Sequence, residues 1–124
     1  MGALADLRTR VVLALAPTNG DTWNVQEVPE DSVTPPAYVL VWGDPWIEPA
    51  THCTVTARLE IVAVAHRVGD EPGVIPVEDL VEHAIGVLRA AKLPAVRTGR
   101  PGPYQVGAVS YYAARLTLTQ PVSV

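Results

Sequence analysis

The chain has 124 residues, 48% of them hydrophobic and 18% charged, which predicts one folded domain over residues 1–124 and excludes a disordered chain. Its formal net charge of −4 argues against a nucleic-acid binder, because phosphate contacts require a basic surface. A single cysteine excludes an internal disulfide and favours a reducing compartment.

The first predicted element is an amphipathic helix over residues 3–16. Its apolar residues recur at helical spacing and form one face: Leu4, Leu7, Val11 and Leu15. Pro17 and the pair Asn19-Gly20 end the helix. The run Val11–Ala16 is too short to span a bilayer, so we expect no membrane segment.

Two short strands are predicted next, over Thr22–Val28 and Ala37–Trp42. The acidic linker Pro29–Pro36 separates them, and its prolines keep it out of a central ladder. The second strand is continuously apolar, which is typical of a strand buried on both faces. We expect Gly43–Pro49 to be a loop that carries Trp46 near the surface.

The central element is a long strand over Thr51–His66, in which apolar and polar residues alternate. One row is apolar and predicted to face the core: Cys53, Val55, Ala57, Leu59, Ile61 and Ala63. The other row is polar: Thr54, Thr56, Arg58 and Glu60. Val62 and Val64 continue the polar row with apolar residues, so we expect the far end of this strand to be covered on both faces.

A second helix is predicted from Pro76 to about Lys92, after a loop over Arg67–Pro76. Acidic residues in its first turn and basic residues in its last turn complement the helix dipole. Its apolar face is formed by Val77, Leu80, Val81, Ala84, Ile85 and Leu88.

The last part of the chain begins with a shaped turn at Gly99–Pro103, which lacks the GKS or GKT ending of a phosphate-binding loop. Strands over Tyr104–Val106 and Val109–Thr119 follow, joined at Gly107. The second is long enough to lie antiparallel beside the central strand. This order of elements predicts an α+β fold, with a mainly antiparallel β-sheet packed against two α-helices. Two short helices cannot cover both faces of the sheet, so the second face is open to water or to another subunit.

The residues with reactive side chains do not form a recognisable catalytic motif. A thiol enzyme built on Cys53 requires a base within hydrogen-bond reach, but the adjacent His52 points to the opposite face of a strand. We expect His83 to be solvated or to snorkel toward solvent. It could also pair with Asp79 one helical turn earlier, which is too few ligands for a metal site. We therefore predict no enzyme activity, no cofactor and no metal.

The three tryptophans allow two interpretations. They could form a ligand-stacking box, or they could pack in the core or an interface, which we favour: Trp23, Trp42 and Trp46.

Three phrases and their order carry a resemblance to a known family. They are ARLEIVAVAHR, VEDLVEHAIGVL and PGPYQVGAVSYYAARLTLTQPV, preceded by an amphipathic helix and a strand bounded by Pro35-Pro36. Nearly the whole chain resembles the tail terminator proteins of long-tailed, siphovirus-type phages, particularly those of actinobacteria.

The resemblance implies a virion structural protein at the tail–neck junction, assembled in the host cytoplasm. Such a protein forms a homo-hexameric ring that ends polymerisation of the tail tube and joins the tail to the head connector. Its partners are further copies of itself, the tail tube protein and the head–tail connector protein, with DNA passing through the ring. The alternatives are another head–tail connector or tail completion ring protein, a small thiol enzyme, or a ligand-binding module.

A ring joint buries loops and sheet edges between subunits. The candidate loops are Pro29–Pro36, Gly43–Pro49, Arg67–Pro76 and Arg97–Pro103. The residues that we predict as contacts to other subunits or partners are Trp46, Asp44, Asp70, Glu71, Arg97 and Arg100.

Overall fold

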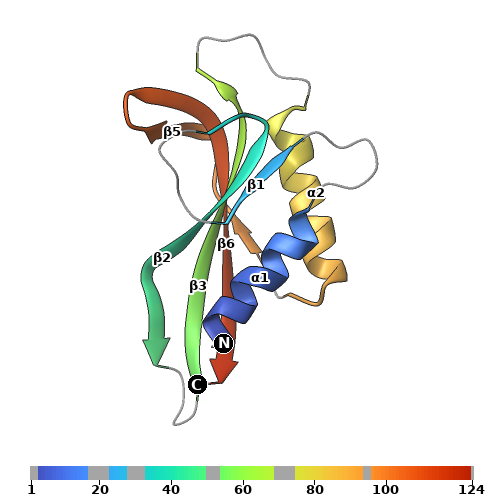
Figure 1. Cartoon of the computed structure of the whole chain (residues 1–124), viewed down its shortest axis with the longest axis vertical. Coiled ribbons are helices and arrows are strands. Elements are labelled where there is room, and N and C mark those ends of the chain that lie inside the picture. Colours follow the sequence, from blue (N-terminus) through green and yellow to red (C-terminus); the bar gives the residue numbers. More distant parts are fainter. Residues whose placement is uncertain are drawn as a thin grey trace.

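The computed structural model describes residues 3–16, 23–27, 33–49, 54–68, 75–93 and 96–123. Their elements occur in an order that Figure 1 follows by colour: α1 (Ala3–Leu15), β1 (Asn24–Gln26), β2 (Ala37–Pro49), β3 (Thr54–Arg67), α2 (Val77–Ala90), β4 (Val96–Thr98), β5 (Gly102–Val106) and β6 (Val109–Ser123).

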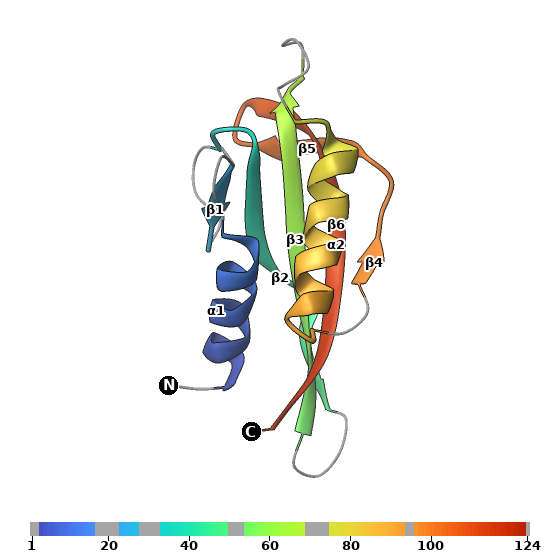
Figure 2. The ribbon, with the colours of Figure 1, turned by 90° about the vertical axis from the view of Figure 1, so that its right-hand side faces the viewer.

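The described strands form one six-stranded sheet in the order β1-β2-β3-β6-β4, and β5 also pairs with β6. Both helices pack on one face of this sheet, as Figure 2 shows from the helix side. The predicted α+β class is confirmed. The sheet is mixed, however, because β1 runs parallel to β2 while the other pairings are antiparallel.

The centre of the sheet is the antiparallel pair β3–β6, which is paired from Thr54↔Ser123 to Arg67↔Tyr111. This confirms the prediction that the two longest strands lie side by side. A register shift between Val64 and His66 marks a bulge near the upper end of β3. Beyond the bulge, His66 pairs with Tyr112 and their rings stack, with centroids 5.4 Å apart.

The main core lies between the helices and the sheet. α1 contributes every third or fourth residue, and α2 does the same, as the helical periodicity predicts. The buried residues of the helices are Leu7, Val11, Leu15, Val77, Leu80, Ala84 and Leu88. Opposite them the sheet presents several small side chains, namely Ala57, Ala63, Ala65 and Ala114, which let the helices approach closely.

A smaller core lies on the opposite face, which we call the open face. It lies at one end of the sheet and consists of Val33, Ala37, Val39, Val62, Val64, Tyr111 and Ala113. The Tyr111 hydroxyl donates to the Val33 carbonyl oxygen at 3.1 Å and holds the segment before β2 over this end. The prediction that β3 is covered on both faces near Val62 and Val64 is therefore confirmed.

Several predicted boundaries are wrong because strand pairing is not a local property of the sequence. Gly43–Pro49, predicted as a loop, belongs to β2, whose ladder resumes at Ile47 after a register shift that spans Pro45. β4 was not predicted, β5 begins inside the predicted turn at Gly102, and β6 continues to Ser123. Residues 51–53 of the predicted central strand lie outside the described residues.

We expect Tyr38→Phe to reduce the free energy of unfolding by about 1 kcal/mol, measured by urea denaturation. The buried Tyr38 hydroxyl donates to the Leu80 carbonyl oxygen at 2.7 Å and thereby joins β2 to α2. Tyr104→Phe is the control and should change stability by less than about 0.5 kcal/mol, because Tyr104 lies at the edge of the smaller core. Equal losses in both variants would contradict this assignment.

Candidate functional site: a groove and a hairpin

The predicted acidic and aromatic contact residues are only partly placed by the structure. Asp44 and Trp46 lie in β2, in the stretch where the register with β3 shifts, and their side chains are outside the description. Asp70 and Glu71 lie outside the described residues altogether. Their role as contacts stays a prediction.

The two predicted basic contacts lie beside a groove that sequence patterns did not reveal. Arg97 is the middle residue of β4, and its side chain is not described. Arg100 follows β4, and its side chain is exposed. The residues on either side of Arg100, Gly99 and Pro101, both line the groove.

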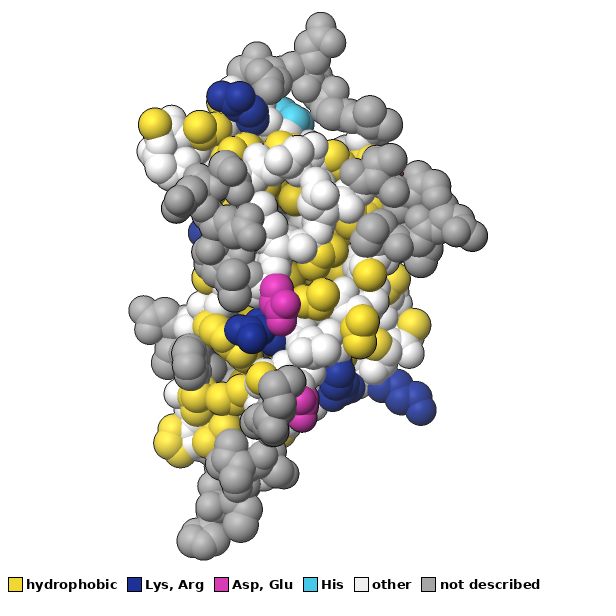
Figure 3. All heavy atoms as spheres, viewed as in Figure 1, with side chains coloured by type: hydrophobic (Ala, Val, Ile, Leu, Met, Phe, Trp, Pro, Cys, Tyr) yellow, Lys and Arg dark blue, Asp and Glu magenta, His cyan; other side chains and the backbone are white. Residues whose placement is uncertain are grey.

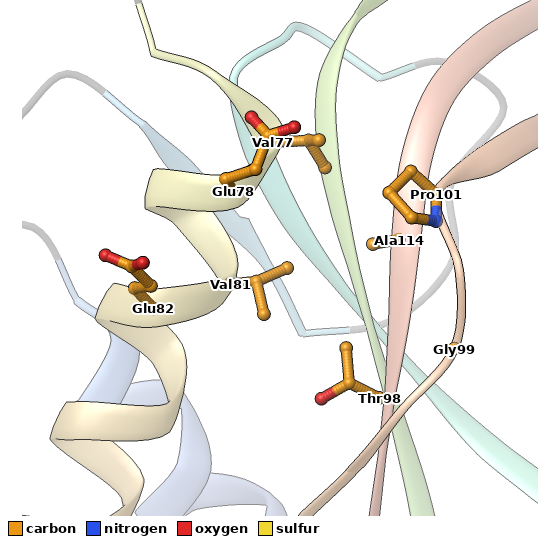
Figure 4. Close-up of a pocket in the computed structure, with 8 residues that line it drawn as sticks. All are labelled: Val77, Glu78, Val81, Glu82, Thr98, Gly99, Pro101 and Ala114. Atoms are coloured by element: carbon orange, nitrogen blue, oxygen red, sulfur yellow. The ribbon is translucent and has the colours of Figure 1, made fainter.

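The groove lies between α2 and the segment from β4 to β5, and has a volume of about 260 Å³. It is lined by Val77, Glu78, Val81, Glu82, Thr98, Gly99, Pro101 and Ala114. In Figure 4 the side chains of Val77 and Val81 point from α2 toward the strand side, and the Glu82 carboxylate points away from it. Glu78, Glu82 and Thr98 also belong to the lining, so the groove is mainly apolar and has two carboxylates on its helix wall.

The local sequence explains this shape. Val77 and Val81 are four residues apart, so they share the face of α2 that is turned toward the sheet. Ala114 in β6 is small and leaves space beneath them. The ladder between β4 and β6 ends at Thr98. The Gly99 amide donates to the Arg115 carbonyl oxygen at 2.9 Å and keeps the following segment beside β6. Without a side chain at Gly99, this wall of the groove stays thin.

The β5–β6 hairpin is a second surface with a distinctive composition. Residues 101–114, PGPYQVGAVSYYAA, contain no charged side chain. The turn is Gly107-Ala108, with Gly107 at φ 59°, as a type II′ turn requires at its first central position. Ala108 is exposed, and the nearby Val68 is 57% exposed. Figure 3 shows hydrophobic side chains at this projection with a basic side chain beside them.

The open face outside the smaller core carries charged and threonine side chains. Two ion pairs cross between neighbouring strands there: Arg58–Glu48 at 3.4 Å and Arg115–Glu60 at 2.9 Å. The Arg115 guanidinium also lies 5.4 Å from the centre of the Tyr104 ring. These pairs are solvent-exposed, so each contributes only about 0–1 kcal/mol and leaves the face wettable. The expectation of a partly open second face is borne out.

A double-mutant cycle can test the packing on this face. A Cβ at position 43 would lie 2.6 Å from the Cγ atom of Arg58, so Gly43→Ala must displace that side chain. We expect a loss of about 1 kcal/mol in the natural chain and little or none when Arg58→Ala is also present, measured by urea denaturation. Gly86→Ala is the control: its Cβ meets nothing within 4 Å and sits in α2, so it should stabilise by about 0.5–1 kcal/mol.

The histidines do not assemble a catalytic or metal site in the described part of the chain. His66 is half-buried, with its Nδ1 atom 2.9 Å from the Arg67 carbonyl oxygen. Among the described residues, no group of three His, Cys, Asp or Glu side chains could hold a metal ion. Cys53 and His52 lie outside the described residues, so it stays a prediction that their side chains point to opposite faces of a strand.

The prediction that His83 is solvated is wrong. Its ring is half-buried and lies against Trp23, with centroids 4.4 Å apart, and its Nε2 atom is buried without a hydrogen-bond partner among the described groups. Helical periodicity alone could not show this, because Trp23 reaches α2 from a distant segment. The Trp23 indole is itself buried and donates to the Leu15 carbonyl oxygen at 2.8 Å, which confirms core packing for this tryptophan.

We expect His83→Ala to lower the free energy of unfolding by about 1 kcal/mol, because it removes the ring that packs on Trp23. His83→Phe preserves an aromatic contact and removes a buried unpartnered nitrogen, so it should be neutral or stabilising. Thermal unfolding followed by tryptophan fluorescence measures both. Equal destabilisation by the two variants would contradict this prediction, because it would show that the imidazole nitrogens, rather than the aromatic contact with Trp23, stabilise the fold.

Sequence patterns missed the groove because one of its walls depends on β4, which has only three residues and no strong alternation. The charge-free run 101–114 was a usable signal for the hairpin as a contact surface. Neither described helix is long and apolar enough to cross a membrane. No protein-family model matches the chain, and no curated protein matches it either.

Proposed function

We propose that this protein is a structural subunit of a phage tail, the tail terminator. Six copies form a ring that ends polymerisation of the tail tube and joins the tail to the head connector. The ring is part of the virion at the tail–neck junction and is assembled in the host cytoplasm. The proposal assigns the chain no enzyme activity and no cofactor.

The observation that carries the proposal is the one-sided layering of the fold. Both helices cover the same face of the sheet, and the smaller core covers only one end of the open face. The described sheet also ends in two very short strands, β1 and β4, each with three residues. In a ring, the contact between neighbouring subunits covers such sheet edges and uncovered sheet faces. The surfaces thus suit contact with other protein subunits.

The described residues favour a contact protein over the two other classes. The buried tryptophan packs in the core, where it supports α1 and α2 rather than lining an open box. His66 and His83 each pack against an aromatic ring, of Tyr112 and Trp23 respectively. Arg100 remains a candidate contact because its side chain is exposed and its two neighbours in the sequence, Gly99 and Pro101, line the groove.

Another head–tail connector or tail completion ring protein would use the same surfaces and is the alternative. The two differ in what the ring binds. A terminator acts on the growing end of the tail tube, whereas a connector binds the head side first.

The test is to add the purified protein to polymerising tail tube protein and to examine the products by negative-stain electron microscopy. We expect sixfold rings, a cap at one end of each tube, and tubes that stop growing. Rings that bind the head connector but leave tube growth unchanged would favour the alternative. Uncapped tubes together with an absence of rings would contradict both.

A further inference from the structure

We propose that the groove beside α2 receives the β5–β6 hairpin of a second copy of this chain, in a head-to-tail contact between neighbouring subunits. This inference deepens the proposed ring function and rests on it. It places the groove and the hairpin in the joint between ring subunits, a contact that the proposed function does not specify.

The groove suits aliphatic side chains rather than a metabolite. Its volume of about 260 Å³ is below the roughly 300–1,000 Å³ of typical small-molecule sites. Its apolar walls are formed by Val77, Val81, Pro101 and Ala114, and Glu78 and Glu82 line it on the helix side. An apolar groove of this size gains most free energy by burying one or two small apolar side chains, because each removes nonpolar surface from water.

The hairpin provides such side chains at the end of a projecting, uncharged segment. Ala108 is exposed at its tip and Val68 is exposed at its flank, whereas Val106 and Val109 beside the turn are half-buried against the smaller core. Exposed apolar side chains that gather at a projection mark a contact with another protein. The type II′ geometry at Gly107 keeps the tip narrow and rigid, so little conformational entropy is lost on docking.

The groove is lined by Pro101 and Ala114 at the base of the hairpin, whereas the tip is at the other end of the β5–β6 ladder, so one copy cannot fill its own groove. Tyr104, Val106 and Val109 pack against the smaller core on the open face. The groove opens on the face that carries α2, and Figure 1 shows the hairpin directed away from both helices. A contact between two different patches of identical chains is heterologous, and repeated around an axis it closes a ring.

Charge fixes the orientation of this contact. Glu78 and Glu82 are exposed on the helix side of the groove, and Arg100 is exposed on the strand side. Arg67, also exposed, lies beside the middle of the hairpin, where it pairs with Tyr111 of β6. Docking that brings Arg67 of one copy toward α2 of the next pairs opposite charges and separates Arg67 from Arg100.

The experiment mixes two single-cysteine proteins, Thr98→Cys at the groove and Ala108→Cys at the hairpin tip, and adds a short bifunctional maleimide. Every protein also carries Cys53→Ser, which removes the native thiol. Both new positions are exposed, so neither substitution disturbs the core. The control replaces the groove variant by Leu13→Cys, which is 70% exposed on α1.

We expect a crosslinked dimer from the groove and hairpin variants and several-fold less from the control. Adding Glu82→Arg to the groove variant should reduce the yield about two- to fivefold, the range of an exposed ion pair. Adding Arg67→Glu to the hairpin variant should restore it. A yield no higher than the control, or preferential crosslinking of Ala108→Cys to itself, would overturn the inference.

Electron microscopy of the same preparations separates this inference from the proposed function. Rings without the crosslink refute the hairpin contact and leave the ring proposal standing. A specific crosslink in protein that neither forms rings nor caps tail tubes establishes the head-to-tail contact and refutes the terminator assignment. Failure of both measurements refutes both.

Discussion

The antiparallel register between β3 and β6 is the constraint on which the rest of the structure depends. Because side chains alternate along both strands, this register places Ala63 opposite Ala114 beneath the helices and Glu60 beside Thr117 on the open face. The outer edge of β3 then pairs with β2, and the outer edge of β6 pairs with β4 and β5. A slip of one residue would exchange the two faces of either strand. The long apolar rows on both strands make such a slip costly.

Most of the fold follows from short-range periodicity. The helical spacing of apolar residues predicted both helices, and the alternation in β3 predicted which of its residues face the core. Periodicity failed where a segment's structure depends on a distant partner. Pro45 and Pro49 are typical loop residues, yet β2 continues through both. The register shift between Trp42 and Ile47 spans Pro45, and Pro49 lies in the resumed ladder opposite Val55. β4 exists only because β6 provides its ladder.

For the candidate site too, local sequence patterns predicted single residues but not features that depend on distant segments. Arg100 was predicted as a contact in a Gly- and Pro-rich segment, and its two neighbours in the sequence line the groove. The groove itself joins α2, β4 and β6, which no local pattern connects. The mainly apolar lining, the uncharged hairpin and the partly open sheet face are the surfaces on which the proposed assembly role rests.

The short edge strands have a consequence for the dynamics of the sheet. β1 is attached by three residue pairs, from Asn24↔Ala37 to Gln26↔Val39, and β4 by three more. Few hydrogen bonds must break to detach either strand, so their amide hydrogens exchange with solvent through local opening, whereas those of β3 and β6 exchange only when the whole domain unfolds. A neighbouring subunit that covers an edge would slow exchange at those amides without altering the fold. Hydrogen exchange therefore offers a map of the edges that assembly protects.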